Sequence, residues 1–102
     1  MAALNPTKIT ATEFGGDQKI YVCTVVPTSA SDTVTFVAAT HKFRTIYSVC
    51  AEIEAGMDAN LLTVQPSFSG LVVTLVTKGA DGNAATNWDS AVIRLTLVVG
   101  NN

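Results

Sequence analysis

Apolar and polar residues alternate along most of the chain, and a period of two is typical of β-strands with one buried face. In residues 91–99 every odd position is apolar, whereas the even positions include Arg94 and Thr96. The expected core face of residues 44–54 consists of Tyr47, Val49, Ala51 and Ile53. The same pattern predicts seven strands, at residues 7–14, 18–26, 33–39, 44–54, 61–68, 71–77 and 91–99.

Turn-forming residues stand at nearly every junction between these runs. Gly15 and Gly16 can adopt positive φ without a steric cost, and Ser69-Gly70 is typical of a tight hairpin. Pro66 cannot donate a hydrogen bond to a neighbouring strand, so its run is expected to be an edge strand or to contain a bulge. No run has helical spacing. The pattern predicts an all-β fold of about seven mostly antiparallel strands, in a β-sandwich or a partly closed barrel.

Composition supports this fold class. The 102 residues include 14 Thr, 13 Val and 5 Ile, and β-branched side chains fit a pleated sheet better than a helix. The length is typical of one domain with one hydrophobic core, so residues 1–102 are expected to form a single β domain. Within it we expect an N-terminal arm at residues 1–6 and a long loop at residues 78–90.

The charge of the chain argues against nucleic acid as a partner. The sequence has 6 Lys and Arg residues and a formal net charge of −2, with no basic stripe to replace the counterions of a phosphate backbone. The first eight residues lack the basic and apolar regions of a signal peptide, and no apolar run is long enough to span a bilayer. We therefore expect the protein to be made in a cytoplasm and to bind no membrane.

Cys23 and Cys50 are then expected to be reduced thiols that behave as small buried residues. A disulfide between them would need adjacent strands and an oxidising compartment.

The chain offers few groups for catalysis. His41 is the only histidine and lies in an expected turn, where a solvated side chain is the simpler interpretation. Glu52 and Glu54 share one strand face and could act as acid and base, but outward glutamates are usually only solvated. Two cysteines and one histidine are too few for a four-ligand zinc site. We expect no enzyme activity, no metal and no cofactor.

The loop at residues 78–90 holds the only tryptophan, Trp88. Its Asp81-Gly82-Asn83 resembles the start of a calcium loop, but the rest of the ligand spacing is absent and a tight turn explains these residues better. Trp88, between Asn87 and Asp89, could insert into a partner or stack on a sugar ring, or it could fold back over the end of the core. The sequence leaves these alternatives open.

The expected surface carries little charge. Charged residues make up 14% of the chain, against ~25% in typical globular domains. Outward positions are mainly Thr, Ser, Ala and Asn, and residues 18–26 and 71–76 are apolar on both faces. A domain of this size cannot bury both faces of every strand, so part of this surface is expected to be covered by another chain.

Several stretches resemble small β-rich structural proteins of tailed bacteriophages, in particular capsid decoration (cement) proteins. The resemblance rests on Leu4-Asn-Pro-Thr-Lys8, Glu13-Phe-Gly-Gly-Asp17, the Thr/Val/Ala-rich strands and the ending Leu95–Asn102. It implies a non-enzymatic virion protein that forms trimers or dimers and stabilises the capsid lattice. It carries over no residue-specific motif.

This resemblance and the weakly charged surface predict protein partners, namely the major capsid protein, copies of the chain itself, or both. The expected contact residues are Met1, Ala2, Ala3, Leu4, Asn5, Pro6, Asn87, Trp88 and Asp89. Deletion of residues 1–6 is expected to leave the fold intact and to abolish lattice binding. The alternative is a carbohydrate- or receptor-binding module, or a tail or fibre component of a virion, that uses Trp88 and its polar neighbours.

Overall fold

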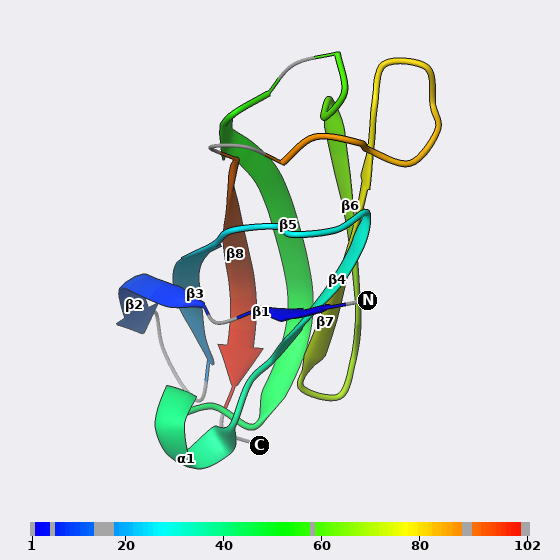
Figure 1. Ribbon diagram of the computed structural model, residues 1–102. Helices are drawn as coiled ribbons and strands as arrows, with labels where there is room; N and C mark the ends of the chain where they lie inside the picture. Colours follow the sequence, from blue (N-terminus) through cyan, green and yellow to red (C-terminus); the bar gives the residue numbers. More distant parts are fainter. Residues whose placement is uncertain (1, 5, 14–17, 58, 89–90, 101–102) are drawn as a thin grey trace.

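Two β-sheets of four strands each face one another in a sandwich (Figure 1). The computed structural model describes residues 2–4, 6–13, 18–57, 59–88 and 91–100. The elements are β1 (Ala2–Leu4), β2 (Thr7–Glu13), β3 (Gln18–Val25), β4 (Ser31–Thr35), α1 (Ala38–His41), β5 (Thr45–Ala55), β6 (Thr63–Ser69), β7 (Val72–Lys78) and β8 (Val92–Gly100).

The strand order defines the two layers. Sheet A has the order β1-β4-β7-β6, and sheet B has the order β2-β3-β8-β5. All neighbouring strands are antiparallel except β1, which runs parallel to β4. The predicted all-β fold is confirmed, and its sheets form two layers rather than a closed barrel.

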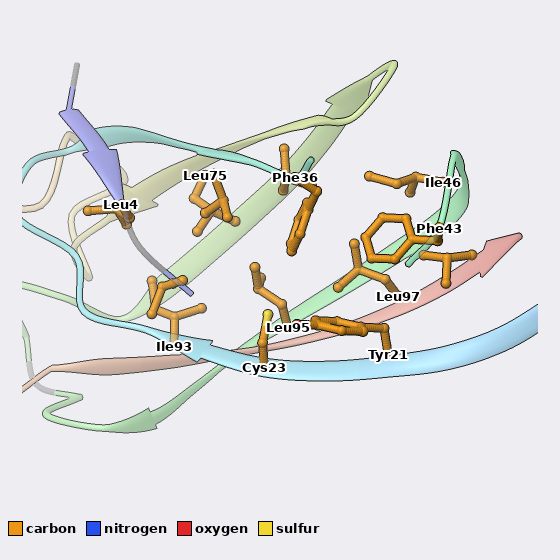
Figure 2. Packing of buried hydrophobic residues seen from close by; sticks show 14 residues of the cluster. Leu4, Tyr21, Cys23, Phe36, Phe43, Ile46, Leu75, Ile93, Leu95 and Leu97 are labelled. Atoms are coloured by element: carbon orange, nitrogen blue, oxygen red, sulfur yellow. The ribbon is translucent and has the colours of Figure 1, made fainter. Parts of the chain in front are cut away.

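The hydrophobic core lies between the sheets and takes alternate residues from each strand (Figure 2). The inward residues of β8 are Ile93, Leu95, Leu97 and Val99, each with an exposed fraction of 0%. Val34, Val73 and Leu75 of sheet A belong to the same buried cluster. The inward face expected for the last strand is therefore confirmed.

β6 forms one edge of sheet A, where Pro66 predicted an edge strand. It pairs with β7 through a tight turn in which Gly70 has a φ of 58°. This left-handed conformation carries no steric penalty in glycine, which explains why the hairpin turns here.

The core face predicted for residues 44–54 is wrong at its first member. Tyr47 has an exposed fraction of 43%, whereas Ile46 is buried in the core at 5%. The pairing of β5 with β8 shifts between Ile46 and Ser48, so one extra residue is inserted here. Such a bulge reverses the inward and outward alternation along the strand. Beyond it Val49 and the following odd-numbered residues pack against the core as expected.

A single helical turn replaces the end of the third predicted strand. The pattern predicts strand structure to Ala39, but β4 ends at Thr35 and α1 follows. Lys42 ends α1 with a φ of 67°, in the left-handed conformation of a helix C-cap. The turn brings the rings of Phe36 and Phe43 to a centroid distance of 5.2 Å, which closes this end of the core. Because α1 buries no residue of its own, it leaves no periodic signal in the sequence.

The segment expected as an N-terminal arm forms a strand of its own domain. Ala2 pairs with Asp32, and Leu4 pairs with Val34. Leu4 has an exposed fraction of 9% and belongs to the core cluster. A deletion of residues 1–6 therefore removes a core side chain and an edge strand, so we now expect the deletion to destabilise the fold.

Leu4→Ala is expected to lower the free energy of unfolding by about 2–4 kcal/mol, because it leaves a cavity between the sheets. Ala3→Ser changes an exposed side chain of the same strand and is expected to cost less than about 0.5 kcal/mol. Urea unfolding followed by circular dichroism measures both variants. Equal stability of the two variants would show that β1 does not pack on its own domain.

Candidate functional site

The predicted contact residues of the N-terminal segment are mostly held within the domain. Ala2, Ala3 and Leu4 form β1, in which Ala3 is exposed, and Pro6 is half-buried. Met1 and Asn5 lie outside the described residues. Of this segment, the exposed side chain of Ala3 is therefore a contact available to a partner.

The long loop is tied to the domain by backbone hydrogen bonds. The Ala85 amide donates to the Thr77 carbonyl at 3.1 Å, and the Thr86 amide donates to the Asn60 carbonyl at 3.2 Å. The Asn83 amide donates to a carboxylate oxygen of Asp81 at 2.9 Å, as expected for the tight turn predicted there. The described part of the loop thus covers one end of the sandwich, and α1 lies at the opposite end (Figure 1).

Trp88 folds back over the core, which was one of the two alternatives for this residue. Its ring packs on a second buried cluster that consists of Leu61, Ala85 and Ala91. Its indole Nε1–H donates to the Thr77 hydroxyl at 3.2 Å. Asn87 is half-buried beside it, and Asp89 lies outside the described residues. The Trp88 ring therefore covers the end of the core and is only partly accessible to a ligand.

His41 is held by its own helical turn. Its Nδ1 accepts a hydrogen bond from the Val37 amide at 2.9 Å. The ring lies edge-on to Phe36, with a centroid distance of 5.0 Å, and near Tyr21 at 6.2 Å. These contacts give the imidazole a structural environment and differ from the freely solvated side chain that the sequence predicts.

The two glutamates of β5 differ in their partners. Glu54 accepts a hydrogen bond from Arg94 Nε at 2.9 Å, in an exposed ion pair. Glu52 is exposed and stands in register with Arg94 on the neighbouring strand. Exposed pairs of this kind contribute little to stability. Glu52, Glu54 and Arg94 together give one end of the outer side of sheet B its charge.

The two cysteines occupy opposite sides of sheet B. Cys23 is buried in the core, and its burial raises the pKa of the thiol to about 12. Cys50 is exposed, which corrects the expectation that both cysteines are buried. Cys23 pairs with Leu95 and Cys50 with Thr96, so alternation along β8 directs the two thiols to different faces. Both cysteines are free, as expected.

Two buried charged residues were missed by the sequence pattern. Asp32 has an exposed fraction of 1%, and its carboxylate accepts hydrogen bonds from the Thr28 and Ser29 amides. The Lys19 ammonium donates to the Lys42 carbonyl at the end of α1, at 2.8 Å. Both groups therefore hold loop backbone at the ends of the sandwich. Asp32 lies among Ser and Thr residues in its strand, so the sequence pattern does not reveal that its side chain is buried.

The outer side of sheet A is almost uncharged, and we call it face A. Strand register places the outward residues of its four strands in contiguous rows. Face A consists of Ala3, Ser31, Thr33, Thr35, Thr63, Gln65, Ser67, Ser69, Val72, Thr74, Val76 and Lys78. Lys78 is the only charged side chain in this set and stands at one end of β7.

The outer side of sheet B, which we call face B, has a charged end and an uncharged remainder of apolar and hydroxyl side chains. Its residues are Thr7, Thr10, Gln18, Ile20, Val22, Thr24, Tyr47, Ser48, Cys50, Glu52, Glu54, Val92, Arg94, Thr96 and Val98. The charged side chains among them are Glu52, Glu54 and Arg94, all near the end of β5. Ile20 and Val98 stand side by side in the apolar part. These two faces contain Ile20, Val22, Val72 and Val76, which are outward apolar residues of the stretches 18–26 and 71–76.

No family model, curated protein or solved structure matches the chain. Across the described ranges, no group of three or more His, Cys, Asp or Glu side chains is placed to hold a metal ion. Within those same ranges, the structure has no helix long and apolar enough to cross a membrane.

Trp88→Ala is expected to lower the free energy of unfolding by about 2–3 kcal/mol, because it uncovers Leu61. Trp88→Phe keeps a ring at this place and is expected to cost about 1 kcal/mol, mainly through the lost bond to Thr77. Thermal or urea unfolding measures both changes. If Trp88→Ala is as stable as the unchanged protein, the ring is not a cover of the core.

In dilute solution at pH 8, one thiol of the folded protein is expected to react rapidly with a thiol reagent, and both thiols are expected to react after unfolding. The reactive species is the thiolate, and burial keeps Cys23 protonated until about pH 12. Counting modified cysteines by mass spectrometry measures this. Cys50→Ser is the control and is expected to leave no rapidly reacting thiol, so a fast reaction in that variant would contradict the burial of Cys23.

Proposed function

We propose that the chain is a non-enzymatic structural protein of a virion, of the capsid decoration or cement type. It binds the surface of a capsid lattice through face A and associates with copies of itself. The observation that carries this proposal is the composition of face A, in which Lys78 is the only charged residue among twelve outward positions.

A surface of this composition suits contact with another protein. Soluble domains normally intersperse charged residues over their outer faces, which keeps them apart in solution. Burial of face A desolvates hydroxyl and methyl groups, which costs much less than the desolvation of charges as long as the hydroxyls form hydrogen bonds in the contact. The Thr and Ser hydroxyls can donate to and accept from the polar groups of a partner.

Repeated binding sites on a capsid lattice raise the overall affinity of a weakly binding protein. One contact of a few hundred Å² contributes several kcal/mol at ~25 cal/mol per Å², before the cost of association is subtracted. Such a contact is weak in isolation. Copies that also bind one another engage several lattice sites at once, which raises the overall affinity strongly. A decoration protein needs this combination of modest single contacts and many sites.

The contacts of His41 and Trp88 also support this proposal. The Nδ1 of His41 is occupied by the Val37 amide, which favours a structural part for this ring over a catalytic one. A sugar-binding module needs an open aromatic platform. Trp88 instead packs on buried residues and donates to Thr77, so its position favours the structural role over the carbohydrate-binding alternative.

Thr74→Glu is expected to weaken co-sedimentation with empty capsids of the encoding virus by at least about tenfold. The substitution places an unpaired carboxylate at the centre of face A, where contact with the lattice would desolvate it. Thr40→Glu adds the same charge at an exposed position of α1 and serves as the matched control.

Both variants are first checked for native circular dichroism and unfolding midpoint. The proposal expects Thr40→Glu to sediment with the capsids as the unchanged protein does. Equal binding of both variants, or no binding of the unchanged protein, would refute the role of face A.

A further inference from the structure

We propose that face B is the surface through which two copies of this chain pair, about a two-fold axis that runs parallel to the strands. This inference specifies the self-association contained in the proposed function, and it needs no capsid to be tested. Four features of face B carry it: its apolar centre, its register, the placement of its charges and its size.

The centre of face B is apolar, and its side chains are short. Ile20 and Val98 are neighbours on the two central strands, and Val22 follows one row away. The neighbouring strand β5 adds the small side chains of Ser48 and Cys50, and Gln18 precedes Ile20 on the same face of β3. Sheets that pack face to face lie ~10 Å apart, and small side chains around a β-branched centre allow that approach. Tyr47 adds an exposed aromatic ring over Gly100, at the end away from the charged residues.

The register of sheet B makes this centre self-complementary. β3 and β8 are the two central strands, and Ile20 and Val98 occupy the same row. A two-fold axis parallel to the strands and centred between them lays β3 of one copy over β8 of the other, at the same height. Ile20 then meets Val98 of the partner subunit, and Val98 meets Ile20 of the partner subunit. Such mutual contacts define an isologous dimer interface.

Face A lacks this property. Its central strands are β4 and β7, whose outward rows combine Ser31 with Val76, Thr33 with Thr74, and Thr35 with Val72. No row on these strands joins two apolar residues. Pairing of two copies is therefore better supported by face B.

The charges of face B are compatible with the same axis. The axis places Arg94 of one copy over Thr24 of the partner subunit, because these two residues share a row. It also places β5 over β2, so Glu52 lies over Thr7 of the partner subunit. Like charges therefore do not meet across the interface, and the exposed Arg94–Glu54 pair remains intact.

The size of face B fits a dimer. Sheet B has four strands, and β3 and β8 are paired over eight residues. At ~4.8 Å between strands and ~3.4 Å per residue, the sheet measures about 19 by 27 Å, or roughly 500 Å² in projection. Its corrugated side chains raise the accessible area above this value. Two such faces together bury about 1,000 Å² in projection, which is the size of a weak, concentration-dependent interface and less than the ~800 Å² per partner of a standard one.

Cys50 provides a built-in probe of this interface. It is exposed in the single chain and lies in one row with Val22 and Thr96 on face B, whereas Cys23 is buried and does not compete for reagent. The test measures the mass of the full chain by sedimentation and the rate of Cys50 alkylation by N-ethylmaleimide, from about 1 µM to about 1 mM.

As the protein concentration rises, the mass is expected to shift from one chain to two. Over the same range the alkylation rate of Cys50 is expected to fall about tenfold or more. Val98→Glu is expected to remain a single chain and to keep the fast rate throughout. Val76→Glu makes the same substitution at an outward valine on a central strand of sheet A, and it is expected to retain both the dimer and the protection of Cys50.

A single chain at every concentration would overturn the inference, as would a mass of three chains or a dimer in which Cys50 reacts at the fast rate. If Val98→Glu fails to fold, the concentration dependence of Cys50 in the unchanged protein decides the question alone. A dimer with protected Cys50 that binds no capsid would support this inference and refute the proposed function. Capsid binding by a strictly single chain would refute this inference, together with the self-association in the proposed function, and would support the capsid contact alone.

Discussion

Each strand of this domain can bury only one of its two faces, because two sheets are the only layers that the described chain builds. The facing sides interdigitate along β8 and β7, where the inward residues are fully buried. Among the residues that the structure describes, no third layer covers the outward sides. The character of the outer surface is therefore decided by the residues at the alternate positions, and here these are mainly β-branched and hydroxyl side chains with few charges.

The ends of the sandwich are closed by its own loops. Trp88 and the backbone around it cover the end that lies opposite α1, with Thr77 as the hydrogen-bond acceptor. At the other end α1 sets Phe36 against Phe43, and Lys19 binds the carbonyl that ends the helix. The described parts of these two end segments are thus engaged within the domain, and the broad sheet faces remain for interaction. This division supports a role in which the molecule covers and joins other proteins rather than binding a small ligand at a loop.

Periodicity predicted the fold class and most of the core, because inward positions in a two-layer sheet must be apolar. The prediction from periodicity was wrong at the places where the alternation of inward and outward residues is interrupted. The bulge at Tyr47 inserts one residue without any change in composition, and α1 is a single turn that buries nothing of its own. The three residues of β1 are too few to show alternation, so the pairing of Leu4 with Val34 depended on tertiary contacts that no local pattern contains.

The candidate contact residues were harder to predict than the strands. A lone tryptophan beside polar residues suits an interface anchor or a core cover equally well, and only the neighbours Leu61 and Thr77, distant in sequence, distinguish the two. In contrast, the weakly charged outer surface could be predicted, because it depends on composition and period alone. Assignment of that surface to two faces required the strand order, which places β4 beside β7 and β3 beside β8.

The most direct measurement is an electron cryomicroscopy map of capsids purified from cells that produce the chain. The account predicts density for the sandwich on the outer capsid surface, with face A against the lattice and face B against another copy. Capsids that carry no such density, or a sandwich attached only by its loops with both faces open to solvent, would contradict it.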